Sequence, residues 1–563
     1  MANLRLLTAA AAIGVAMMVF RNLWLPWTLL VPVTVFVGLV AAHARVLGKA
    51  DGARRARALY ERGLSRIDGH WQGTGPDGAH LLAGQPFAAD LDLFGPGSLF
   101  QLLHTARTEA GEATLAAWLL ASATPAEVQA RQQAVAELRD ALAFRESLAI
   151  AASETHTSRT GMLARWATGG GGRLPHALLP LFAIVGLIGT GLLIAAFRTQ
   201  IDGRIVLLWL VAQGGLGAAF WKRCMSALVG IDVAARDLAL LSSLLARLEG
   251  QHFVSPKLQQ LKRSLSATAP PSRQIAQLLR LVDWLDSTRN VFFAPVALAL
   301  MLPFQLAVAI SLWHQKHASS IDTWLLAVGE AEALVSLATF AYEHPDDPFP
   351  TIVDAGAVFE ATGLGHPLIA ETTAVRNDVA LGESHPHLLL VSGSNMSGKS
   401  TLLRAIGVNV VLALAGAPVR ATSLRVSQLS IGASLRIDDS LQAGHSRFYA
   451  EILRIRSIVD LTRGSQPLLF LLDEVLAGTN SHDRRIGAEA IVRTLVSHNA
   501  IGLVTTHDLA LADVVSSMNG LAANVHFEDR IENGAMVFDY RMRPGVVTHS
   551  NALALMRAIG LDV

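Results

Sequence analysis

A glycine-bracketed loop between an apolar run and a helix-like segment constrains the fold of this chain more than any other feature. Residues 388–401 read LLLVSGSNMSGKST, and the apolar residues at the start predict a buried strand. The loop has the form G-x-x-x-x-G-K-S, a phosphate-binding loop. Its glycines let backbone N–H groups turn towards phosphate oxygens, and the next helix points its positive end at the same anion. We therefore expect an α/β domain that binds a nucleotide.

The residues of this loop have distinct expected roles. The ammonium of Lys399 would reach the β- and γ-phosphates, and the hydroxyl of Ser400 would bind Mg²⁺. A chance glycine-rich turn is the alternative, and the strand before the loop, the helix after it and an acidic strand downstream argue against it. The residues expected to bind ATP are Gly393, Ser394, Asn395, Met396, Ser397, Gly398, Lys399, Ser400 and Thr401.

Two further apolar runs end in residues suited to phosphate chemistry. The run PLLFLLDE ends in Asp473 and Glu474, at the carboxyl end of a predicted strand, where α/β sheets bind ligands. Asp473 would hold Mg²⁺, directly or through water, and Glu474 would polarise the attacking water. A third predicted strand, which begins at Ala500, leads to His507. A lone histidine is usually structural, but at this strand end it is better explained as a sensor of the γ-phosphate.

Long apolar segments dominate the amino-terminal half. Hydrophobic residues make up 52% of the 563 residues and charged residues 16%, whereas charge is nearer ~25% in soluble domains. Residues 6–42 predict one membrane hairpin and residues 177–220 a second. The alternatives are a secretory signal for the first segment and a buried soluble hairpin for the second. A second span that follows at once, and glycines that permit close helix contact, argue against them.

The charge pattern predicts which side of the membrane each part occupies. Basic residues follow the first hairpin and place the next domain in the cytoplasm. Residues 291–313 are also apolar, but Pro295 and Pro303 interrupt them. A crossing there would put the nucleotide-binding domain outside, so we expect a core or re-entrant helix, followed by a soluble helix at 323–342. The predicted domains are a transmembrane hairpin at 1–46, a helical domain at 47–345 and an ATPase domain at 346–563.

Net charge and cysteine content limit the partners and the compartment. The net charge is +1, so no global basic field argues for nucleic acid. Scattered basic residues such as Lys257 and Arg273 could contact phosphates, but a solvated helix face explains them better. Cys224 is the single cysteine, which excludes an internal disulfide and fits a reducing compartment.

Several motifs of the carboxy-terminal part resemble those of the MutS family of mismatch-repair ATPases. GSNMSGKST is similar to the family's GPNMxGKST, with Ser394 in place of proline. DDSLQAGHSRFYAEI, at residues 438–452, resembles DDLxxGxSTFMxEM, and DEVLAGTNS, at residues 473–481, resembles DEIGRGTST. A weaker likeness to the family's helical core brings the similarity to most of residues 97–563, apart from the membrane segments.

The resemblance implies an α/β P-loop (ABC-like) ATPase domain preceded by an all-α MutS-core-like domain, here carrying transmembrane hairpins. It implies ATP and Mg²⁺ as cofactors and a homodimer. In the family, a loop that matches Gly444, His445 and Ser446 completes the partner subunit's ATP site, and Ala477 stands where the family has arginine. The alternative is that Ser446 only caps the helix that carries Phe448.

Three departures qualify this likeness. No mismatch-reading domain fits before the core, a hairpin stands where the DNA clamp would interrupt the core, and the sequence stops before the family's carboxy-terminal dimerisation element. We therefore expect a membrane-anchored ATPase in an inner or plasma membrane, with its ATPase domain in the cytoplasm. It would act as a nucleotide-driven switch that binds DNA in mismatch repair or a related transaction. The alternatives are a membrane assembly or signalling ATPase without DNA, and a transport ATPase, for which no LSGGQ-like segment is present.

Overall fold

The structure is a computed structural model that describes most of the chain. The described residues are 2–21, 23, 25–82, 84–152, 160–169, 172–198, 201–265, 269–354, 356–394, 396–436, 447–476, 478–507, 511–532 and 535–547.

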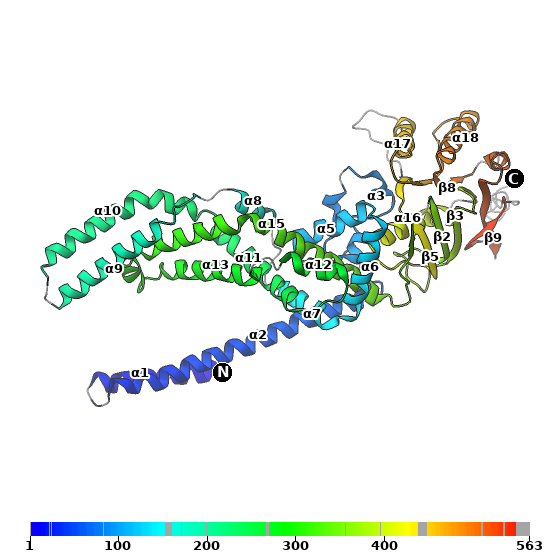
Figure 1. The fold of residues 1–563 in the computed structure, drawn as a ribbon. Coiled ribbons are helices and arrows are strands. Elements are labelled where there is room, and N and C mark those ends of the chain that lie inside the picture. Colours follow the sequence, from blue (N-terminus) through cyan, green and yellow to red (C-terminus); the bar gives the residue numbers. More distant parts are fainter. Residues whose placement is uncertain are drawn as a thin grey trace.

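The chain forms an extended helical part followed by an α/β part (Figure 1). Two helical hairpins, α1–α2 and α9–α10, point away from the sheets at the same end of the molecule. The helices of this part are α1 (Ala2–Phe20), α2 (Leu30–Ile67), α3 (Pro86–Asp90), α4 (Leu99–Leu103), α5 (Glu109–Leu120), α6 (Pro125–Asp140), α7 (Leu142–Ala152), α8 (Thr160–Thr168), α9 (Leu178–Phe197), α10 (Gly203–Ala227), α11 (Ile231–Gly250), α12 (Pro256–Leu265), α13 (Pro271–Ser287), α14 (Ala294–Ala299) and α15 (Leu302–Glu343). The expected helical region before an α/β domain is confirmed.

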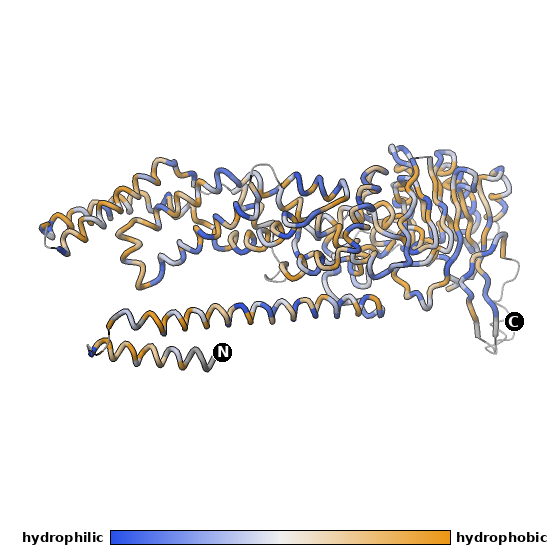
Figure 2. The backbone as a smooth tube through the Cα atoms, turned by 60° about the horizontal axis from the view of Figure 1, so that its bottom comes forward, coloured by the Kyte–Doolittle hydropathy of each residue, from blue (hydrophilic) through white to orange (hydrophobic). Residues whose placement is uncertain are grey.

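Four described helices are long and apolar enough to cross a membrane by length and composition, namely α2, α9, α10 and α15. In the apolar 18-residue stretch of each helix, none of α2 is buried and only 17% of α9 and of α10 is buried. In α15, by contrast, 83% of this stretch is buried by protein. Figure 2 shows that the outer ends of both hairpins are apolar and that the inner half of α2 is polar. Helix α2 continues without a break past residue 46, the predicted end of the first domain.

The apolar segment at 291–313 is not one straight helix. It contains α14 and the start of α15, and between them Met301 has a positive φ of 54°. Pro303 lies in the first turn of α15, where a missing N–H costs no hydrogen bond. The side-chain amide of Gln213 on α10 donates to the carbonyls of Leu298 and Ala299 at this break. The hairpin α9–α10 therefore covers the break.

Helix α15 is the central element of the helical part. It extends without interruption to Glu343, so the two segments expected as separate helices form one helix of 42 residues. Gly329 packs against α5, where a Cβ would lie 2.7 Å from the carbonyl oxygen of Ala110. The carboxylate of Glu332 is fully buried and accepts hydrogen bonds from the N–H groups of Arg107 and Thr108. Burial raises the pKa of Glu332 to about 7.

The α/β part contains two sheets. The four-stranded sheet has the order β1-β5-β2-β3, and the six-stranded sheet has the order β10-β9-β4-β8-β7-β6. In the larger sheet, β9, β4, β8, β7 and β6 are parallel, and β10 pairs antiparallel with β9. The strands are β1 (Thr351–Val353), β2 (Val358–Leu364), β3 (Asn377–Gly382), β4 (Leu388–Ser392), β5 (Ser423–Ser427), β6 (Ser430–Ser434), β7 (Leu468–Leu472), β8 (Ile501–Thr506), β9 (Ala522–Glu532) and β10 (Ala535–Pro544); the helices are α16 (Lys399–Ala415), α17 (Arg447–Leu461), α18 (Ser481–Ser497) and α19 (Ala512–Ser516).

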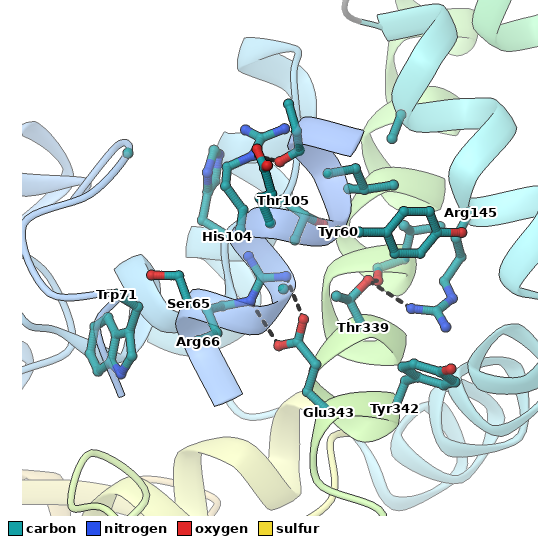
Figure 3. Close-up of a pocket in the computed structure, with 18 of the residues that line it drawn as sticks. Tyr60, Ser65, Arg66, Trp71, His104, Thr105, Arg145, Thr339, Tyr342 and Glu343 are labelled. Atoms are coloured by element: carbon teal, nitrogen blue, oxygen red, sulfur yellow. Dashed lines mark hydrogen bonds and ion pairs between the residues drawn. The ribbon is translucent and has the colours of Figure 1, made fainter. Parts of the chain in front are cut away.

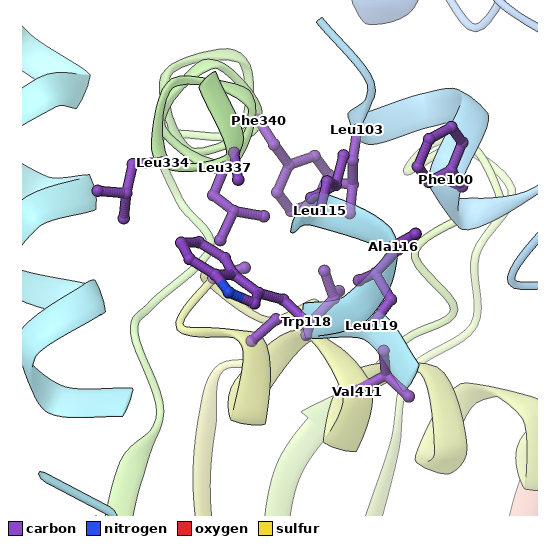
Figure 4. Close-up of a cluster of buried hydrophobic side chains, with 14 of the residues drawn as sticks. Phe100, Leu103, Leu115, Ala116, Trp118, Leu119, Leu334, Leu337, Phe340 and Val411 are labelled. Carbon is purple, nitrogen blue, oxygen red and sulfur yellow. The ribbon is translucent and has the colours of Figure 1, made fainter. Parts of the chain in front are cut away.

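The two parts share one hydrophobic core around α16. Nearly every side chain of this helix is buried, because one face contacts β7 and β8 and another contacts α5 and α6. Figure 4 shows Val411 of α16 beside Trp118 and Leu119 of α5. At Gly407 the helix has no Cβ, which would lie 2.5 Å from the side chain of Leu91. The helical part is therefore packed directly on the helix that follows the predicted phosphate loop.

Charged residues connect the same junction. Asp90, the last residue of α3, is almost fully buried and accepts hydrogen bonds at 2.9 Å from the Arg436 N–H and from the Arg454 guanidinium. Its carbonyl oxygen accepts a hydrogen bond from Arg404 of α16. Asp92 pairs with the side chains of Arg404 and Arg436. One turn of the helical part thus binds three arginines from separate elements of the α/β part.

Candidate functional site

The predicted phosphate loop joins β4 to α16, as the sequence indicated. Gly393 and Gly398 have φ values of 147° and 103°, which favour glycine. A Cβ at Gly393 would lie 3.0 Å from the Phe527 carbonyl oxygen, and one at Gly398 would lie 3.1 Å from the Tyr540 ring. Residues of strands β9 and β10 therefore leave little room for a side chain at either glycine. Asn395 lies outside the described residues.

Lys399 is the buried cation of the loop. Its Nζ donates hydrogen bonds to the carbonyl oxygens of Gly393 at 2.9 Å and Ser394 at 2.8 Å. Burial lowers the pKa of Lys399, and the negative charges of Glu474 and Asp473 oppose that shift. The lysine therefore lies at the loop with two carboxylates near enough to act on its charge.

The loop fits a phosphate group by two further features. Within the described part of the chain, the hydroxyls of Ser394 and Ser397 are buried and have no hydrogen-bond partner. Buried hydroxyls without partners are costly in folded proteins, and anionic oxygens would satisfy them. Both hydroxyls belong to the loop that leads to Lys399 and to the amino-terminal end of α16. The amino-terminal end of a helix is a favourable position for a phosphate group.

The acidic residues lie at the same edge of the sheet as the loop. Asp473 follows β7 directly, and its Oδ1 accepts a hydrogen bond of 2.5 Å from the hydroxyl of Thr505 on β8. The same hydroxyl accepts a hydrogen bond from the Glu474 N–H. Ser400 lies in the first turn of α16, which also begins at this edge. Ser400 and Asp473 would hold Mg²⁺ here, since Mg²⁺ binds through one or two protein oxygens together with phosphates and water.

Glu474 and His507 meet at the mouth of the site. The His507 Nε2 lies 2.7 Å from the Glu474 carboxylate, and both side chains are about two-fifths exposed. Glu474 has a φ of 48° and Leu476 a φ of 58°, backbone conformations that cost about 1–3 kcal/mol each and cluster at functional sites. The Glu474 carboxylate is therefore in contact with His507 and still accessible to solvent.

The buried carboxylate of Glu451 supports this strained turn. It accepts a hydrogen bond of 2.5 Å from the N–H of Leu476. Glu451 lies on α17, and Phe448 of the same helix packs against Gly478, where a Cβ would lie 3.1 Å from the phenylalanine side chain. The turn after β7 is therefore held by the helix that follows residues 437–446. Ser446 and the rest of that segment lie outside the described residues.

A cavity of about 400 Å³ opens beside the loop. Its walls include Lys399, Glu474, Ile369 and Asn377, together with Phe527 and Tyr540, which the sequence analysis did not single out. Asn377 fixes one wall, because its side chain donates to the Tyr540 carbonyl and accepts from the Met542 N–H. The volume suits a small ligand, for which pockets measure roughly 300–1,000 Å³.

Burial keeps one histidine of this cavity neutral. Burial lowers the pKa of His366 to about 4, so its ring carries no charge at neutral pH. The ring Nδ1 accepts a hydrogen bond from the Leu368 N–H. The one signal in the sequence for this wall was the pair of short motifs GHPLI and RND, at residues 365–369 and 376–378.

Comparisons with known proteins match the part of the chain that carries this site. The family model of MutS domain V matches residues 389–562. The DNA mismatch repair protein MutS of Geobacillus thermodenitrificans is 30% identical over 274 residues, which is 46% of this chain and 29% of that protein. The DNA mismatch repair protein MutS 2 of Halobacterium salinarum is 31% identical over 269 residues, 46% of this chain and 30% of that protein. The chain thus spans less than a third of the length of these curated relatives.

Two substitutions separate nucleotide binding from hydrolysis at this site. We expect Lys399→Ala to abolish tight ATP binding, because it removes the buried charge that faces the phosphates. We expect Glu474→Gln to bind ATP normally and to hydrolyse it about 10²–10⁴-fold more slowly, because the attacking water loses its base. Fluorescent-nucleotide binding and phosphate release measure the two effects.

Glu489→Gln on the exposed face of α18 is the matched control, since it removes a carboxylate that pairs only with Arg493 among the described residues. Wild-type turnover by Glu474→Gln, with this control also unchanged, would show that Glu474 is not the base.

Proposed function

The chain belongs to the MutS family through its carboxy-terminal domain, and we propose that it is a membrane-anchored, Mg²⁺-dependent ATPase that works as a nucleotide-driven switch. The observation that carries the proposal is the convergence of Lys399, Asp473 and the Glu474–His507 pair at one edge of the six-stranded sheet. These residues come from three strand ends, and the sheet register aligns those ends.

The residues divide the work of hydrolysis. Lys399 and the loop N–H groups bind and orient the phosphates, and the hydroxyls of Ser394 and Ser397 add donors. Bound between Ser400 and Asp473, Mg²⁺ would neutralise charge on the phosphate oxygens. Glu474 accepts a proton from the attacking water, and His507 holds that carboxylate in place.

The switch would act through the junction around α16. The amino-terminal end of α16 binds phosphate, while its sides pack on α5 and α6 of the helical part. Arg404 of α16, Arg436 and Arg454 all contact the turn at Asp90 and Asp92. Any shift of α16 or α17 between nucleotide states must therefore move or break contacts with the helical part. Packed interfaces of this kind change between discrete arrangements rather than deform gradually.

Similarity to the MutS family suggests that the proposed ATPase binds DNA in mismatch repair. The relatives are DNA mismatch repair proteins by name, and they match this chain only in part. The alternative is a membrane assembly or signalling ATPase that does not bind DNA. One observation favours this membrane alternative. The hairpin α9–α10, with exposed apolar side chains such as Leu187 and Leu208, extends from the helical part.

The two forms predict different responses to DNA. For a DNA-acting ATPase we expect duplex DNA to change the ATPase rate of the full chain several-fold, and DNA-cellulose to retain the protein at low salt and release it at high salt. The rate measured without DNA is the reference, and Lys399→Ala gives the background. An active ATPase that ignores DNA at every salt concentration would contradict the DNA-acting form and favour the membrane alternative.

Membrane anchoring is supported by the exposure of the hairpins. The outer half of α2 and the helices α9 and α10 leave their apolar side chains uncovered, whereas the long apolar helix α15 is covered by protein. Uncovered apolar surface on this scale is costly in water and is stable in lipid. Both hairpins extend in the same direction, away from the sheets (Figures 1 and 2).

Reporter insertions test this topology. We expect a cytoplasmic signal from the turn at Gly73, from the turn at Gly230 and from Asp346. We expect an external signal from Leu23, between α1 and α2, and from Asp202, between α9 and α10. The insertion points lie outside the helices. An external signal at Asp346 would mean that α15 crosses the membrane, and the proposed topology would be wrong.

We further propose that the active unit is a homodimer with shared ATP sites. Lys399, Asp473 and Glu474 approach the phosphates from one subunit, and no arginine stands in the DEVLAGTNS segment next to the catalytic acid. In the family, the missing donors come from the partner through the loop that matches Ser446. Anchoring in a membrane raises the effective concentration of subunits and favours such contacts.

Mixing two inactive variants tests the shared site. Lys399→Ala subunits keep Ser446 but do not bind ATP, and Ser446→Ala subunits bind ATP but lack the donor. We expect each variant alone to be inactive and the mixture to regain up to one working site in each mixed dimer. No recovery after verified subunit exchange would contradict the shared site.

A further inference from the structure

A second, larger cavity lies in the helical part, apart from the phosphate loop. Its volume is about 770 Å³, and it is enclosed by the inner half of α2, the segment before α5, α7 and the last turns of α15 (Figure 3). No residue of the phosphate loop or of the turn after β7 lines it. Its size lies within the range of small-molecule sites.

Four arginines line this cavity, and two of them have acidic or aromatic partners. Arg66 forms an ion pair of 2.5 Å with Glu343, which is the last residue of α15. The guanidinium of Arg145 lies 4.7 Å from the centre of the Tyr342 ring and donates to the hydroxyl of Thr339. Figure 3 shows the Arg66–Glu343 pair and the contact of Arg145 with Thr339 at this cavity.

The guanidinium groups of the other two arginines form no ion pair with a carboxylate within the described part of the chain. Arg62 donates only to the carbonyl of Ala58, one turn earlier in α2. The Nε of Arg107 is buried without a hydrogen-bond partner. Burial lowers the pKa of Arg62 to about 10, and the positive charges of Arg107 and Arg66 lower it further. Burial also lowers the pKa of Arg107, and the charge of Glu332 opposes that shift.

The carboxylates around the cavity are engaged by other groups or are only partly charged. Glu343 is engaged by Arg66, and Glu146 accepts a hydrogen bond from the Tyr60 hydroxyl. Glu61 pairs with Arg57 on the outer face of α2. Glu332 has a pKa of about 7 because it is buried, so it carries only part of a charge at neutral pH. A buried or partly buried positive charge without a counter-ion is costly, and an anion placed beside it stabilises it.

The rest of the lining is mostly apolar. The apolar side chains come from α2, α7 and α15, and they include Leu59, Leu64, Ile67, Leu142, Leu148 and Val335. We propose that this cavity binds an amphiphilic anion, a molecule with one carboxylate or phosphate group and an alkyl or acyl chain. The head group lies between Arg62 and Arg107, and the chain lies along the apolar walls. A guanidinium pairs well with either head group.

The position of the cavity suits such a ligand. Helix α2 leads from the cavity to the exposed apolar hairpin at the amino terminus. Helix α15 ends at the cavity and leads, through Asp347 and its contact with Arg420 at 3.4 Å, into the α/β part. A molecule with a chain and an anionic head group would therefore contact both α2, which leads to the amino-terminal hairpin, and α15, which leads to the α/β part.

Octyl phosphate is the probe, and octanol and inorganic phosphate are its two halves. Calorimetric titration of the full chain in a neutral detergent measures the affinity of each. We expect octyl phosphate to bind at least tenfold more tightly than either half. We expect Arg62→Gln and Arg107→Gln to weaken that binding at least tenfold. Arg57→Gln, which alters an exposed arginine of the same helix outside the cavity, should leave it unchanged.

Unfolding temperatures without ligand show whether the variants are folded. Equal affinity of Arg62→Gln and Arg57→Gln for octyl phosphate would overturn the proposal. The proposal would also be overturned if the unsubstituted protein bound octanol or inorganic phosphate as tightly as octyl phosphate. Dodecanoate and a dodecanoyl lysophosphatidate then distinguish a free fatty acid from a lipid with a phosphate head group. Binding of either supports the site, and binding of neither contradicts it.

Discussion

The burial of α16 between two layers is the constraint on which the rest of the structure depends. Its amino-terminal turn faces the phosphate loop, one side packs on β7 and β8, and another side packs on α5 and α6. A helix enclosed in this way tolerates almost no polar side chain, and LLRAIGVNVVLALA is apolar nearly throughout. Asn409, the polar exception near its middle, is fully satisfied by donating to the Gly365 and Ala405 carbonyls and accepting from the Arg420 N–H. The same helix thus serves the nucleotide site and the core of both parts.

Buried charges give this junction its specificity. Asp90 of the helical part binds two arginine-bearing segments of the α/β part. Burying a carboxylate costs free energy unless its partners are placed well, so such contacts select one arrangement of the parts rather than merely hold them together. Non-specific apolar packing around α16 would permit the parts to slide, and these hydrogen bonds fix their register.

Three regions of the molecule carry the proposals made above. Apolar hairpins occupy one end, the candidate nucleotide site lies at the sheet edge at the other, and the arginine-lined cavity lies on α2 and α15. Helix α15 contacts the α9–α10 hairpin, lines the arginine-lined cavity with its last turns, and packs on α5 and α6, which in turn contact α16. This continuity gives a physical route by which events at the apolar end and at the nucleotide site can influence each other.

The sequence by itself determined the strand–loop–helix at Gly393 to Lys399 and the acidic strand end at Asp473, because each motif is contiguous and its glycines and apolar runs act over a few residues. It also placed His507 at a strand end. Tertiary structure alone decided that Thr505 joins Asp473 to Glu474, and that Tyr540 and Asn377 form the cavity wall. It also decided that α15 is one helix, because packing on α5 and α6 outweighs the polar residues between its two apolar segments. Such outcomes depend on contacts between residues far apart in the chain, which local periodicity does not encode.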